Sequence, residues 1–177
     1  CGHELASTPP YGRQGYQFIK DKAHGFHTIT QHGFAVLVLT DFMDAKAPCP
    51  AAARKTYLTQ HVPEPDPRFL LRFAVPELES WLLADRQGMA DFFKISLDHV
   101  PERPEDERDP KGTLVNLARK CSLGPRRKAI VPKEGDNLGR LYIPTLRDFI
   151  ENHWNIDAAR DNAPSLARCL TRLRELA

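Results

Sequence analysis

Two apolar runs separated by a helix-length segment constrain the fold of this 177-residue chain more than any other feature. The first, FAVLVL, covers residues 34–39 and continues into Thr40 and Asp41. The second, RFLLRFAV, covers residues 68–75 and follows the breaker VPEPDP. Apolar runs without polar alternation are typical of central strands covered on both faces, as in parallel sheets. The intervening PCPAAARKTYLTQH predicts a helix, so we expect a right-handed strand–helix–strand crossover.

The rest of the chain has mainly helical patterns, which makes the C-terminal half helical. PELESWLLADRQGMADFFK predicts one helix, or two with a break at Gly88. Further helices are predicted in PKGTLVNLARKC, IPTLRDFIENHW and SLARCLTRLREL. No repeat or composition shift marks a boundary, so we expect residues 1–177 to form a single α/β domain, a small parallel sheet flanked by helices.

Composition excludes several classes of protein. Apolar residues make up 41% and charged residues 27%, and the formal net charge of +2 argues against a basic coat for nucleic acid. No apolar run is long enough to span a membrane, and no signal peptide is evident. The four cysteines lack C-x-x-C spacing, which argues against a zinc site. We therefore expect a cytoplasmic protein without a membrane partner. Because the chain opens on Cys1 rather than Met, an N-terminal piece is expected to be missing.

Acidic residues follow both expected strands. Asp41 and Asp44 come after the first, and Glu77 and Glu79 come after the second. If the strands are parallel, their carboxyl ends meet at one edge of the sheet, where ligands of open α/β folds bind. Mg²⁺ or Mn²⁺ prefers such oxygen ligands, so these four acids are the predicted metal site. The alternative for the aspartates is an ordinary turn after a strand.

Helical geometry separates the two glutamates. At about 100° per residue, Glu79 falls between Leu82 and Leu83 in the apolar sector, whereas Glu77 falls on the more polar side. A carboxylate in an apolar sector is a candidate for a functional site. The alternative for both glutamates is a favourable position in a first helical turn, near the positive end of the helix dipole. Asp85 is expected to cap a following helix.

Basic residues supply two further candidates. In DPK, Asp109 suits a helix N-cap, and Lys111 would neutralise phosphate charge near a metal. In the stretch GPRRKAIVPKEGDNLG, predicted to be a loop, Arg126, Arg127 and Lys128 form the densest positive run. Such residues give sequence-independent affinity for nucleic acid, although a solvated loop is the alternative.

The segments PELESWLLAD, DPKGTLVNLARK and NAPSLARCLTRLREL resemble a bacterial family of unknown function, number 4276. That family is Toprim-like, with a Rossmann-like sheet, and is similar to the nuclease Toprim domains of overcoming-lysogenization-defect proteins and to RloB-like proteins. The resemblance implies Mg²⁺-dependent phosphodiester chemistry, a role in phage defence and an ATPase partner. Asp41 and Asp44 match the family's aspartate loop, and Glu77 and Glu79 match its acid pair.

The chain departs from the family at two points. Its aspartates are spaced D-x-x-D rather than D-x-D. The family's leading glutamate, which lies in an earlier strand, has no counterpart, so either the chain lacks that natural N-terminal strand or the site lacks its first acid. The sequence therefore supports three hypotheses. The first is a Mg²⁺- or Mn²⁺-dependent nuclease or phosphodiesterase with Asp41, Glu79 and Lys111 as catalytic residues. The second is a non-catalytic partner module of an ATPase, and the third is a structural domain whose acids are turn and cap residues.

Overall fold

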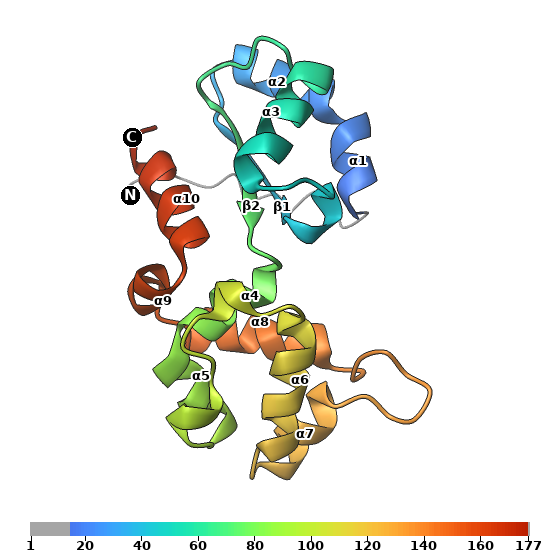
Figure 1. Ribbon diagram of the computed structural model, residues 1–177, viewed down its shortest axis with the longest axis vertical. Helices are drawn as coiled ribbons and strands as arrows, with labels where there is room; N and C mark the ends of the chain where they lie inside the picture. The colour runs from blue at the N-terminus through green and yellow to red at the C-terminus, as the bar shows by residue number, and fades with distance from the viewer. Residues whose placement is uncertain (1–14, 177) are drawn as a thin grey trace. The chain divides into compact units, whose positions relative to one another are not determined.

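The computed structural model describes residues 15–176, which form two compact units (Figure 1). Of the described residues, the first unit comprises 15–75 and 167–176, and the second comprises Pro76–Leu166. Each unit has its own cluster of buried apolar side chains. The sequence shows no composition change at Val75, so this grouping follows from contacts between distant residues. The described residues include no helix long and apolar enough to cross a membrane.

The first unit is built on the predicted pair of strands. β1 (Val36–Asp41) and β2 (Phe69–Ala74) are parallel, hydrogen-bonded neighbours, in register along their whole lengths. The crossover between them contains α3 (Pro50–His61), which begins with a proline, a residue favoured at the start of a helix. The parallel pairing and the helical crossover are therefore confirmed.

Alternation along the strands gives this sheet two different faces. One face packs against α3 and against two helices that precede the sheet, with Val38, Leu71 and Phe73 in the shared core. The preceding helices are α1 (Gly15–Asp21) and α2 (Ala23–Gln31). The opposite face carries Leu37 and Arg72 and lies toward the second half of α10 (Pro164–Arg174).

The two strands differ in burial. Five of the six β2 residues are buried, but only Val38 is buried in β1, where Leu37 is 43% exposed. We expected the first run to be a central strand. In the part of the chain that the structure describes, β1 instead has a single neighbouring strand, so its other edge is not paired with a strand there.

The second unit is helical. Its core is formed by apolar side chains from several of its helices, including the fully buried Leu83, Phe93 and Phe149. The helices within it are α4 (Leu78–Ala84), α5 (Arg86–Phe93), α6 (Pro110–Lys120), α7 (Gly124–Ile130), α8 (Tyr142–Asn152) and α9 (Ile156–Asn162). Short 3-10 turns at Leu97–His99 and Pro104–Asp106 lie between α5 and α6.

Three local expectations change in this unit. The break between α4 and α5 falls at Asp85 rather than at Gly88, because the Asp85 side chain caps α5 as predicted. Part of the expected basic loop is helix α7. Helix α9 was not predicted at all, although Asn155 caps it by accepting hydrogen bonds from two backbone amides.

Asp85 also holds distant segments of the second unit together. Its carboxylate accepts hydrogen bonds from the backbone N–H of Gly88 at 3.0 Å and of Asn155 at 2.7 Å. A Cβ atom on Gly88 would lie 2.1 Å from an Asp85 oxygen, so glycine is what permits this close approach. Asp85 is 2% exposed and has a structural role, as the sequence indicated.

Candidate functional site

Polar side chains at the starts of three helices in the second unit, α4, α6 and α8, lie close together. They are Glu77, Glu79, Lys111 and Tyr142, and are called the acid cluster below. The Lys111 Nζ atom lies 3.8 Å from Glu77 Oε1 and 3.9 Å from Glu79 Oε1. The Tyr142 hydroxyl donates a hydrogen bond of 2.9 Å to the same Glu79 oxygen. Two carboxylates thus share one ammonium group.

Both glutamates are buried, but for different local reasons. Glu79 is 9% exposed and lies in the first turn of α4, on the apolar side that the helical pattern predicted. Glu77 is 7% exposed, although we expected it on the polar side. The expectation was wrong because the helix begins at Leu78. Glu77 is the N-cap residue in extended conformation, so helical angles do not apply to its side chain.

Lys111 is brought to the cluster by the local structure at the start of α6. Asp109 accepts a hydrogen bond of 2.8 Å from the Gly112 backbone N–H, and Pro110 occupies the first helical position. The predicted N-cap is therefore confirmed. This cap fixes the first turn of α6, from which the Lys111 side chain reaches both glutamates while staying 38% exposed.

Tyr142 was missed by the sequence analysis. It is 2% exposed and lies at the start of α8, 63 positions from its partner Glu79. Burial, and then the negative charge of Glu79, raises the pKa of Tyr142 above its usual range. The phenol therefore stays protonated and acts as a donor. No local pattern identifies such a residue, because its role depends on a contact made only in the folded unit.

The two predicted aspartates lie in the first unit. Asp41 is the last residue of β1 and is partly buried, and Asp44 is exposed in the 3-10 turn Met43–Ala45. Asp44 follows the strand as expected, whereas Asp41 is still part of it. Glu77 and Glu79 belong to the second unit, so the four predicted metal ligands are divided between the two units. Among residues 15–176, no group of three or more His, Cys, Asp or Glu side chains is arranged to hold a metal ion.

The predicted basic run on α7 contains two kinds of residue. Arg126 is half-buried, with its guanidinium 3.8 Å from the centre of the Phe92 ring, and it donates a hydrogen bond to the Phe92 carbonyl oxygen. It is thus engaged within the second unit. Arg127 and Lys128 are exposed, which leaves them accessible to a phosphate backbone.

Comparison with protein-family models, with curated proteins and with solved structures finds no match to this sequence. Function is therefore inferred from the residues of the acid cluster and their surroundings.

Proposed function

We propose that this chain is a divalent-cation-dependent phosphodiesterase of Toprim type that acts on nucleic acid. The observation that carries the proposal is the acid cluster, in which two buried carboxylates converge on one lysine. Burying two acids together is costly unless a cation compensates them. An arrangement that tolerates this cost is more typical of functional sites than of helix ends, where a single exposed acid suffices.

The donor atoms of the cluster fit Mg²⁺ or Mn²⁺. Carboxylate oxygens are the ligands these hard cations prefer, and Mg²⁺ is commonly held by one or two carboxylates, with water and substrate phosphate completing its shell. Glu77 and Glu79 would hold the ion. Asp41 and Asp44 belong to the first unit, and their role as metal ligands stays a prediction from the sequence. The bound ion would activate water and stabilise charge on the attacked phosphate.

The other residues of the site have distinct roles in this proposal. Lys111 offsets the negative charge of the phosphate, because its ammonium lies beside the acids and is partly open to solvent. Tyr142 fixes the orientation of Glu79 by donating to one of its oxygens. Arg127 and Lys128 contact the nucleic-acid backbone, which gives affinity without reading sequence.

Hydrolysis assays test the proposal. The chain is incubated with bis(p-nitrophenyl) phosphate and with single- and double-stranded DNA and RNA, in the presence of Mg²⁺ or Mn²⁺. We expect cation-dependent cleavage that Glu79→Gln abolishes. Glu151→Gln, which neutralises an exposed carboxylate on α8, is the matched control and keeps full activity. Absence of cleavage with every substrate and both cations contradicts an active enzyme.

One observation favours a second function, that of a non-catalytic partner module for an ATPase. Lys111 lies beside both glutamates and offsets part of their negative charge without a metal ion. In that case divalent cations leave the melting temperature unchanged. Glu79→Gln then changes the stability of the fold, and neither the variant nor the parent cleaves any substrate. A metal-induced rise in melting temperature that Glu79→Gln removes supports the phosphodiesterase instead.

A further inference from the structure

The outer side of β1 presents backbone groups that no other described residue satisfies. The N–H groups of Val36 and Phe42 donate to the carbonyl oxygens of Arg68 and Ala74, at 2.9 and 2.8 Å. Backbone groups alternate in direction along a strand, so even-numbered residues face β2 and odd-numbered residues face outward. Leu37 therefore points its N–H and C=O groups to the open side, as Leu39 does, and neither residue has a hydrogen-bond partner there within residues 15–176.

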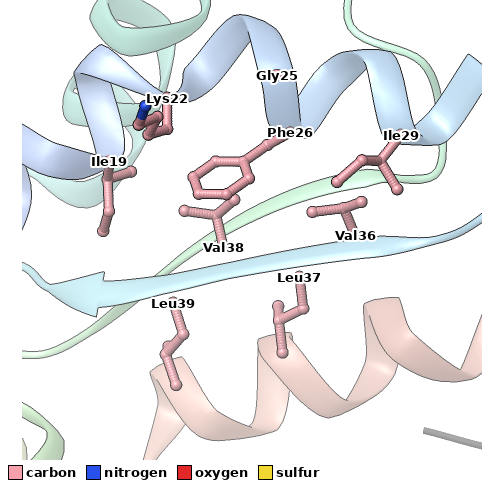
Figure 2. A pocket seen from close by; sticks show the side chains of 9 residues that line it. All are labelled: Ile19, Lys22, Gly25, Phe26, Ile29, Val36, Leu37, Val38 and Leu39. Carbon is pink, nitrogen blue, oxygen red and sulfur yellow. The ribbon is translucent and has the colours of Figure 1, made fainter. Parts of the chain in front are cut away.

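An apolar groove of about 690 Å³ runs along this open side. Figure 2 shows Phe26 and Ile29 of α2 pointing toward the side chains of Val36 and Val38, while the leucines of β1 point to the opposite side of the strand. Groove residue Ile29 is 45% exposed, and nearby Phe34, which precedes β1, is 64% exposed. The groove thus combines unpaired backbone with apolar side chains, and an exposed edge of this kind favours pairing with another strand.

The usual obstacles to strand pairing are missing from this edge. Natural edge strands are commonly protected by charged side chains, prolines or bulges. The sequence VLVLT at residues 36–40 contains no charge and no proline, and Asp41 at the end of β1 is the strand's single charged residue. Lys22 is the sole charged residue that lines the groove, and it is exposed. Above the strand, a Cβ atom on Gly25 of α2 would meet nothing within 4 Å, so the helix leaves space beside the edge.

The outward-facing backbone groups of Leu37 and Leu39 can pair with the same groups of an identical strand. If a second copy of β1 is placed antiparallel, with a two-fold axis through Val38, Leu37 of each copy lies opposite Leu39 of the other. Each of these pairs exchanges N–H and C=O groups, which is the hydrogen-bonded arrangement of antiparallel strands. The same operation brings the leucines together on one face and the valines on the other. Residues 36–40 of the two copies meet without a charge between them, and Asp41 of each copy lies opposite Ala35 of the other at the end of the paired segment.

We propose that this chain forms a symmetric dimer through the open edge of β1, with a second copy as the occupant of the groove. The two sheets then become one continuous sheet in the order β2–β1–β1–β2. Symmetric two-fold interfaces are the commonest form of association between identical chains. The interface lies in the first unit and does not depend on the proposed enzymatic activity.

Sedimentation measurements on the full chain test the dimer. We expect a dimer at about 100 μM that dissociates on dilution toward about 1 μM, a range that brackets a micromolar Kd. Leu37→Lys should weaken association by at least about tenfold, since it places a charge in the pairing edge. Ile143→Lys, which alters a 61%-exposed apolar residue of α8 in the second unit, is the control and leaves the dimer intact.

Amide hydrogen exchange gives a readout that needs no variant. The Leu37 and Leu39 amides should be protected at high protein concentration and exchange faster on dilution, while the Val38 amide, which faces β2, stays protected throughout. A chain that is monomeric at about 100 μM overturns the proposal. So does a dimer that Leu37→Lys leaves unchanged, or protection of the leucine amides that is independent of concentration, because an intramolecular segment or a different surface would then be responsible.

Discussion

Replacing Lys111 with methionine tests whether the acid cluster is built to accept a cation. Methionine keeps much of the length of the side chain and removes its charge. The two carboxylates then lose the ammonium that lies 3.8 and 3.9 Å away from them. Because the glutamates are 7% and 9% exposed, water compensates only part of that loss.

The magnitude follows from these distances. At an effective dielectric constant of about 20, each charge pair near 4 Å is worth about 4 kcal/mol before desolvation is counted. Removing one partner of a fully buried pair typically costs about 3–5 kcal/mol. Since the Lys111 side chain is 38% exposed, solvent screening lowers this cost, and we expect a loss of about 1–3 kcal/mol in the free energy of unfolding.

Urea unfolding at neutral pH measures the loss, with and without millimolar Mn²⁺. Without metal, the unfolding midpoint of Lys111→Met should fall. Mn²⁺ should restore the midpoint. Once the positive charge of Lys111 is removed, the two carboxylates bind a cation more tightly, and a bound cation stabilises the native state by mass action. Lys128→Met removes an exposed lysine of α7 and is the matched control, with an expected effect within about 0.5 kcal/mol and no response to Mn²⁺.

Two results refute this reasoning. If Lys111→Met is as stable as the parent, the lysine does not compensate the glutamates in solution. If the variant is destabilised but Mn²⁺ restores neither its midpoint nor its melting temperature, the cluster is a structural ion pair, and the proposed metal site at Glu77 and Glu79 is wrong.

Three further predictions concern residues outside the cluster. Asp85→Asn should lower the free energy of unfolding in urea by about 2–3 kcal/mol, because one of the two buried backbone amides that it binds loses its acceptor. Asp109→Asn should lower it by under about 0.5 kcal/mol, because asparagine is an equally good N-cap. Hydrogen bonds from the neighbouring Arg68 lower the pKa of Asp66 from 3.8 to about 2. The contribution of Asp66 to the stability of the fold is therefore present above about pH 4 and is lost as the pH falls toward 2. Asp66→Asn should flatten this part of a profile of stability against pH. Arg126→Met should destabilise the fold by about 0.5–2 kcal/mol, whereas Arg127→Met should leave stability unchanged and reduce the salt dependence of nucleic-acid binding.

Local chemistry in the sequence determined much of the secondary structure. The two apolar runs separated by a helix-length segment gave parallel strands, because a crossover of that length returns the chain in the same direction. Asp85 and Asp109 were identified as caps because a cap acts on amides within three residues of itself. The burial of Glu79 followed from helical periodicity within a single turn of the apolar sector.

Tertiary structure decided which of these residues meet. Tyr142 reaches Glu79 across 63 positions, and Arg126 reaches Phe92 across 34, distances at which no periodic pattern carries information. The burial of Glu77 depended on where α4 begins. The helix begins at Leu78, two residues after Pro76, the proline that opens the predicted helix. The lack of a second strand beside β1 among residues 15–176 likewise could not be predicted, because an apolar run indicates a buried strand but not how many neighbouring strands it has.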